Sequence, residues 1–315
     1  MTAPRPRAIL LCIVPALLAT ICLVGAVSVG DDERAVQAPK KSDAPATPVS
    51  TRVVRLTVRV EGNGGDAYVE LPLAQSDDHQ TITDENLITR GFQVEEVTRD
   101  GNRLAILTFP KLEGPRRITY QFTAETRPTQ VDVPATPVAV GDPAEEDRAW
   151  LRPTRHLQST SPIVREKLIG FARPRMEAGH NDAIRLSWDL ARTGYVRKKD
   201  GSRTVLKATR TGHASDKGID RLFATFLRTS GVPSRPVIGV DVGRKRGGKL
   251  TTWVEAKAGG TWVPMSAPRN QWGKLPSRYV KLAHGDRPFI VRDGVESVRY
   301  RWKISRPVQT AEEAP

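Results

Sequence analysis

Few side chains in this sequence have the type and spacing that catalysis requires. The only two cysteines, Cys12 and Cys22, both lie in an apolar N-terminal segment. A thiolate nucleophile is therefore excluded from the rest of the chain, together with disulfides and zinc-binding cysteine pairs there. The five histidines are scattered, and no two have the spacing that places metal ligands on one helix face: His79, His156, His180, His213 and His284. We accordingly expect no metal and no cofactor.

Two other combinations could supply reactive groups. Ser215 could act as a nucleophile with His213 as its base, but residues two apart at a helix start rarely adopt the required geometry. A serine before an acidic residue is instead typical of an N-cap, with the carboxylate of Asp216 near the positive end of the helix dipole. Asp189 with Asp216 or Glu255 would give the carboxylate pair of a glycosidase. However, Asp189 is predicted on a helix face and Glu255 on the solvent side of a strand.

The elements that would position these residues fall into two sets. Short alternating segments separated by Gly-, Asn- and Pro-rich turns predict an Ig-like β-sandwich over residues 52–127. The alternating segments are 54–60, 67–71, 92–97, 104–109 and 118–124. A Pro-rich stretch at 128–149 is predicted to connect this domain to the next.

Residues 150–305 have a different pattern, with helices first and strands later. Helices are predicted to start at Pro162 and at Asn181-Asp182, and a third carries an apolar stripe that ends before a Ser-Gly-Val-Pro stop. Strands are then predicted at 236–242, 251–257, 261–264, 288–291 and 295–304. This order predicts an α+β domain with an antiparallel sheet. The tryptophans in it occupy apolar-phase positions, which favours core packing over a sugar-binding role: Trp188, Trp253, Trp262 and Trp302.

The N-terminal segment has the features of a membrane anchor. Arg5 and Arg7 precede an uncharged stretch over residues 8–30, and three acidic residues follow at once. This pattern predicts that residues 1–30 form an uncleaved transmembrane signal anchor, with the bulk of the chain exported. A cleavable signal peptide is the alternative. Residues 31–51 and 306–315 are predicted to be a disordered linker and tail.

Several segments of the second domain resemble the transglutaminase-like superfamily of the papain-like fold, in its bacterial form with an N-terminal β-sandwich. They are WLRP at 150–153, GHASD at 212–216, GVPSR at 231–235, VIG at 237–239, TTWVE at 251–255 and WVPMS at 262–266. The resemblance extends from about Val53 to Ile304.

In that superfamily, a cysteine opens a helix, a histidine precedes a Trp-x-Glu strand, and an aspartate follows a Trp-x-Pro turn. The helix N-terminus stabilises the thiolate, the histidine moves the proton, and the carboxylate orients the histidine. The matching positions in this sequence are Ala214, Thr251 and Ser266, although a gap-free alignment places the nucleophile at Asp216. The resemblance therefore implies a pseudoenzyme. The alternative is a hydrolase or acyltransferase that uses unconventional residues in the same cleft.

Charge is unevenly distributed along the chain. Residues 31–148 contain 14 basic and 21 acidic residues, whereas residues 149–315 contain 33 and 14, a net charge of +19. A domain with a large positive net charge favours anionic partners. For an exported protein these are envelope polymers, lipid headgroups or acidic proteins rather than nucleic acid. The predicted contact is a hairpin loop with Arg244, Lys245, Arg246 and Lys249, whose charge could also serve only solubility. We therefore expect a non-catalytic binding or scaffold module, held at the cell envelope in the periplasm or at the cell surface.

Overall fold

The computed structural model of the chain describes residues 49–136, 144–244 and 247–307. The predicted anchor at 1–30, nearly all of the predicted linker and residues 308–315 of the predicted tail lie outside these ranges. Within the described ranges, no helix is long and apolar enough to cross a membrane. The first described strand, β1, begins at Ser50, so the last two residues of the predicted linker belong to it.

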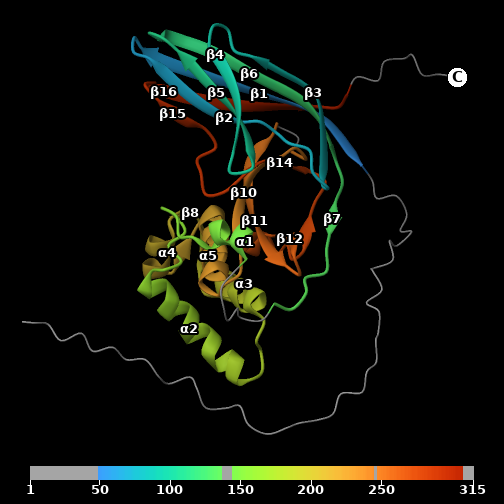
Figure 1. Ribbon diagram of the computed structural model, residues 1–315, viewed down its shortest axis with the longest axis vertical. Helices are drawn as coiled ribbons and strands as arrows, with labels where there is room; N and C mark the ends of the chain where they lie inside the picture. The colour runs from blue at the N-terminus through green and yellow to red at the C-terminus, as the bar shows by residue number, and fades with distance from the viewer. Residues whose placement is uncertain (1–48, 137–143, 245–246, 308–315) are drawn as a thin grey trace, which may run out of the picture. The chain divides into compact units, whose positions relative to one another are not determined.

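The N-terminal domain is a β-sandwich of two four-stranded antiparallel sheets, as the alternating segments predict (Figure 1). One sheet has the order β16-β1-β6-β3, with bounds Ser297–Ser305, Ser50–Asn63, Glu113–Thr126 and Gln80–Ile88. The other has the order β15-β2-β5-β4, with bounds Val291–Asp293, Ala67–Pro72, Asn102–Phe109 and Gln93–Arg99. The inward side chains of both sheets form one core that includes Val54, Leu56, Leu107, Ile118 and Phe122. Strands β1 and β6 in particular have one buried face and one more exposed face, which is the cause of their alternating sequence.

The last two strands of the chain correct the predicted domain boundary. The sequence analysis places 288–291 and 295–304 in the second domain, but β15 pairs with β2 and β16 pairs with β1 along its length, from Val53↔Ser305 to Glu61↔Ser297. Figure 1 shows β16, in red, beside β1, in blue. The alternation of residues 298–304 predicts a strand but carries no information about its partner. The second domain is therefore inserted between strands of the sandwich.

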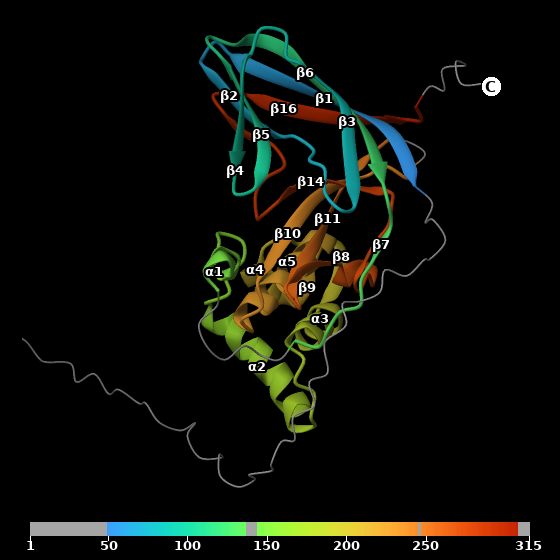
Figure 2. The ribbon, with the colours of Figure 1, turned by 45° about the vertical axis from the view of Figure 1, so that its right-hand side comes forward.

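The inserted domain is α+β with an antiparallel sheet, as predicted. The sheet has the order β12-β11-β10-β14, with bounds Thr261–Met265, Lys249–Ala258, Ser234–Asp241 and Tyr279–His284. Its helices are α1 to α5, with bounds Glu145–Leu151, Pro162–Glu177, Ala183–Thr193, Val205–Thr211 and Asp216–Thr229. Helix α5 packs against β10 and β11 (Figure 2). It buries Leu222, Phe223, Phe226 and Leu227, the stripe that the sequence predicts.

Short elements and one core cluster connect the two domains. Strand β7 (Thr129–Gln130), in the predicted connector, pairs with β13 (Lys274–Leu275) of the inserted domain. The remaining short elements are β8 (Val196–Ser202), β9 (His213–Ala214) and the 3-10 helix Ala267–Arg269. Apolar residues of β10 and β14, among them Val240 and Val280, belong to the same cluster as the sandwich core. The interface between the sandwich and the inserted domain is therefore continuous with the sandwich core.

Candidate functional site

The N-terminus of α5 is built by a serine cap, as the sequence predicts. Ser215 has an extended backbone, and its Oγ accepts a hydrogen bond from the Gly218 amide at 3.2 Å. The Ser215 amide is itself held by the Ser202 carbonyl at 3.0 Å, which fixes the entry of the chain into the helix. Asp216 follows as the first helical residue, where its negative charge is favoured by the helix dipole.

The three positions that the resemblance assigns to a catalytic triad differ in their exposure to the cleft. Ala214 is fully buried and does not line the cleft in front of α5. Thr251 is largely buried and does line this cleft, together with Asp216. Ser266 is fully buried at the end of β12, behind the cleft. Of the two positions proposed for the nucleophile, Asp216 is therefore the one that faces the cleft.

Asp216 is held by an arginine. The Arg197 guanidinium donates two parallel hydrogen bonds to its carboxylate, at 2.5 and 2.7 Å, and a third to the Pro268 carbonyl at 3.0 Å. The hydrogen bond to Asp216 raises the pKa of Arg197 above its ordinary value. A bidentate pair of this kind stabilises the ionised carboxylate and restrains its orientation. The gap-free alignment with the superfamily pattern assigns the nucleophile position to this residue, Asp216.

A buried polar cluster lies behind the cleft around Asp220, one turn further along α5. The Asp220 carboxylate accepts hydrogen bonds from Thr252 Oγ1 at 2.8 Å and Ser266 Oγ at 3.1 Å, and Arg269 Nη1 lies 3.5 Å from it. Arg269 also donates to Ser266 Oγ at 2.9 Å. Burial raises the pKa of Asp220 to about 7, against the opposing effects of Arg269 and the two hydroxyls. Ser266 thus acts as a hydrogen-bonding partner of Asp220.

The alternative reactive groups are also committed to structural contacts. His213 Nδ1 lies 2.6 Å from the Thr211 carbonyl oxygen, and Ser215 Oγ is 3.3 Å from the Ser202 carbonyl oxygen, so each has a backbone partner. Asp189 pairs with Arg185 one turn earlier in α3. The expected position of Glu255 on the solvent side of β11 is wrong. It is 5% exposed and pairs with Arg235 at 2.7 Å and Lys281 at 3.0 Å, because the second face of the sheet is covered too.

The tryptophans divide into two groups. Trp188 and Trp253 are buried, as core packing requires. Trp262 and Trp302 are partly exposed, so for these two the prediction of core packing is only partly met. Trp262 lies under the Arg235 guanidinium, whose central carbon is 4.2 Å from the ring centroid.

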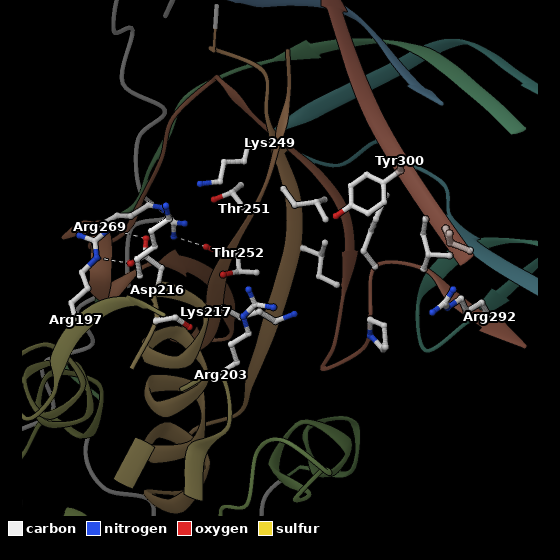
Figure 3. A pocket seen from close by; sticks show the side chains of 18 residues that line it. Arg197, Arg203, Asp216, Lys217, Lys249, Thr251, Thr252, Arg269, Arg292 and Tyr300 are labelled. Carbon is white, nitrogen blue, oxygen red and sulfur yellow. Dashed lines mark hydrogen bonds and ion pairs between the residues drawn. The ribbon is translucent and has the colours of Figure 1, made fainter. Parts of the chain in front are cut away.

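The cleft in front of α5 has a volume of about 870 Å³. Figure 3 shows Lys217 and Arg203 on the α5 side and Tyr300 and Arg292 across from them. Within the described residues, the lining contains neither cysteine nor histidine. It includes seven basic side chains and one acidic side chain, Asp216; the basic ones are Arg197, Lys199, Arg203, Lys217, Lys249, Arg269 and Arg292.

The predicted anion-binding loop connects β10 to β11, and these strands pair as the predicted hairpin. Arg244 and Lys249 are exposed, whereas Lys245 and Arg246 lie outside the described residues. Lys249 lines the cleft, so the loop ends at its rim.

The sequence analysis missed Arg203 and Lys217, which are isolated in the sequence and belong to no basic run. One local signal was present: a lysine in the first turn of a helix is opposed by the helix dipole, which makes Lys217 an unusual choice.

Comparisons with known proteins agree with this fold. Residues 178–267, which span α3 to the 3-10 helix, match the family model of the transglutaminase-like superfamily. A solved structure assigned as a candidate cysteine protease from Cytophaga hutchinsonii aligns with a TM-score of 0.63 at 15% identity, over 83% of this chain and 93% of that chain. The segment 178–267 is therefore transglutaminase-like, and the solved structure supports the same fold.

Two further solved structures align less well. The periplasmic domain of TgpA from Pseudomonas aeruginosa, bound to ethylmercury, gives a TM-score of 0.35 at 13% identity over 72% of this chain and 91% of that chain. A candidate protease from Parabacteroides distasonis gives 0.27 at 11% identity over 74% and 64%. The search of curated proteins found no match.

Proposed function

We propose that this chain is a non-catalytic member of the transglutaminase-like superfamily, exported and anchored to the membrane, which binds an anionic component of the cell envelope. The observation that supports the loss of catalysis is the Arg197–Asp216 pair at the N-terminus of α5, opposite Thr251. A carboxylate held by an arginine is a poor nucleophile, and the hydroxyl of Thr251 cannot replace a histidine as a proton carrier near neutral pH. The export and the anchor rest on Arg5, Arg7 and the apolar segment that follows them.

The rival proposal is a hydrolase or acyltransferase with unconventional residues in this cleft. It would need a nucleophile and a base within hydrogen-bond reach of each other. Ser215 and His213 instead make separate backbone contacts, and the Asp189, Asp216 and Glu255 carboxylates each pair with their own cation. The contacts of these groups therefore favour the non-catalytic proposal.

We expect the purified chain from residue 31 onward to show no enzymatic turnover. It should neither incorporate amines into glutamine side chains nor hydrolyse peptide amides, as measured by fluorescent amine incorporation and by mass spectrometry of peptide libraries. Asp216→Asn and Thr251→Val serve as matched cleft variants, and Asp189→Asn as a variant outside the cleft. Turnover that disappears in the cleft variants but persists in Asp189→Asn would overturn the non-catalytic assignment.

We also expect the basic domain to bind anionic surfaces through the β10–β11 loop. Each basic residue near an anionic surface contributes on the order of 1 kcal/mol, and salt screens this attraction within a Debye length of about 8 Å. Co-sedimentation with phosphatidylglycerol vesicles should weaken by several orders of magnitude at low salt when Arg244, Lys245, Arg246 and Lys249 are changed to Gln. The control variant removes the same number of charges from helix α2. In it, Gln replaces Arg165, Lys167, Arg173 and Arg175. An equal loss in both variants would leave only a non-specific or solubilising role for the loop.

A further inference from the structure

The cleft in front of α5 contains more positive charge than the protein compensates. Two of its seven basic side chains pair with carboxylates, Arg197 with Asp216 and Arg269 with Asp220. The other five make no ion pair within the described part of the chain: Lys199, Arg203, Lys217, Lys249 and Arg292. Like charges that converge on one cavity repel each other, and an anion in the cavity would relieve this repulsion.

Lys217 lies in an electrostatically unfavourable position. It lies in the first turn of α5, where the helix dipole disfavours a cation, and Arg221 follows one turn later. Burial, together with the charge of Arg221, lowers the pKa of Lys217 below its ordinary value. The amides of Asp216 and Lys217 donate to no protein group among the described residues. Positions that violate a local preference are expected at functional or strained sites.

The opposite wall of the cleft is mainly apolar, although Arg292 also lies on that side (Figure 3). Ile238 and Leu250 come from β10 and β11, Phe289 and Ile290 from the segment before β15, and the last two from β16: Val298 and Tyr300. The Tyr300 side chain is 44% exposed, and its ring contacts the edge of Phe289 with centroids 5.3 Å apart. Figure 3 shows this ring facing the cleft across from Lys217 and Arg203. The cavity therefore has a cationic side around Lys217 and Arg203 and a mainly apolar side around Tyr300.

We propose that this cleft binds an amphiphilic phosphate ester, with the phosphate near Arg203, Lys217 and Lys249 and the apolar part against Leu250 and Tyr300. Five uncompensated cations favour a phosphate over a carboxylate, because a phosphate offers more acceptor oxygens and can carry two charges. The proposal rests on the non-catalytic role of the cleft and gives that role a ligand class. The ester could be a membrane lipid or a free molecule.

Calorimetric titration with three probes tests this ligand class. Decyl phosphate, below its micelle concentration, has both features, pyrophosphate has only the charge, and decanol has only the apolar chain. We expect decyl phosphate to bind at least tenfold more tightly than pyrophosphate, and more weakly as salt rises, since the apolar chain adds burial to a screened attraction. No measurable binding of decanol is expected. Equal affinity for decyl phosphate and pyrophosphate would overturn the apolar half of the proposal, and no binding of either would overturn all of it.

Variants locate the site. The double change Arg203→Gln/Lys217→Gln should weaken decyl phosphate binding by about 10- to 100-fold, whereas Tyr300→Ser should weaken decyl phosphate binding but not pyrophosphate binding. Arg165→Gln/Lys167→Gln, on the exposed face of α2, removes the same charge and should have no effect. Thermal unfolding with no probe present shows that each variant is folded. Affinities that fall equally in the cleft and α2 variants would overturn the assignment to the cleft.

The same variants distinguish the source of the ester and separate the two proposals. If phosphatidylglycerol vesicles bind the protein and Arg203→Gln/Lys217→Gln prevents it, the source is a lipid. If only monomeric decyl phosphate shows this dependence, the source is a free ester. Release of inorganic phosphate from a bound probe would refute the non-catalytic role while leaving the binding site intact.

Discussion

Restoring the superfamily carboxylate by Ser266→Asp is expected to destabilise the protein by about 3–5 kcal/mol without restoring activity. Ser266 is fully buried and donates a hydrogen bond to the Asp220 carboxylate at 3.1 Å. An aspartate at this position removes the donor and places a second negative charge against a buried one, and Arg269 is the cation that pairs with Asp220 among the described residues. Urea unfolding at pH 8, above the pKa of Asp220, measures the loss.

Two companion variants make this result specific. Ser266→Ala removes only the hydroxyl, and it should cost about 1–3 kcal/mol because the Asp220 oxygen is left short of a donor. Asp220→Asn, combined with Ser266→Asp, removes the repulsion and should recover most of the difference between aspartate and alanine at position 266. A double variant no more stable than Ser266→Asp alone would show that the cost comes from the volume of the aspartate. In that case charge repulsion is not the cause.

Glu255→Ala is expected to destabilise the protein by about 3 kcal/mol. The Glu255 carboxylate is buried between Arg235 and Lys281, and its removal leaves the Arg235 guanidinium without a carboxylate partner. Lys281 keeps a second partner in Asp77, 3.3 Å away, so the loss is at the lower end of the range for buried pairs. Glu95→Ala removes an exposed strand glutamate and is the matched control, with an expected change within about 0.5 kcal/mol.

The pH dependence of stability is a second, independent test of the role of Glu255. Burial alone would raise the pKa of Glu255, but the charges of Lys281 and Arg235 outweigh it and hold this pKa below its ordinary value. A carboxyl with a lowered folded-state pKa stabilises the protein above its unfolded pKa, and that stability is lost as the pH falls through the folded value. Below about pH 4.5, the free energy of unfolding should therefore fall less steeply with decreasing pH in Glu255→Ala than in the wild type. If the free energies of unfolding of the two proteins depend on pH in the same way, Glu255 is excluded as a source of the acid sensitivity.

Local patterns in the sequence predict most of the elements that frame the cleft. The stripe from Leu222 to Leu227 and the cap at Ser215 locate α5 because both signals depend on neighbouring residues in one helix. The hairpin of β10 and β11 follows from two apolar runs around a glycine-rich turn. Each of these features is determined by residues that are close together in the sequence, so the sequence alone is enough to predict it.

Features that depend on long-range packing could not be predicted in this way. The burial of Glu255 arises because both faces of the β10–β11 sheet are covered, which alternation within β11 does not reveal. The basic wall of the cleft joins Arg203, Lys217 and Lys249 from separate segments, and only the fold brings them together. The net charge of the domain indicated an anionic partner, but the predicted contact was the loop, because the loop is the part of the basic surface that is contiguous in sequence.

The pairing of β16 with β1 makes the sandwich dependent on the last part of the chain. A polypeptide is synthesised, and in an exported protein also translocated, from its N-terminus onward. All strands and helices of the inserted domain precede residue 285, so that domain has its complete sequence before Ser297–Ser305 emerges. Until then one edge of β1 lacks its partner and presents open backbone groups, which is a condition that favours aggregation or capture by a chaperone. The N-terminal domain therefore completes its folding last, and truncation of the chain before Ser297 is expected to disable the domain farthest from the cut in sequence.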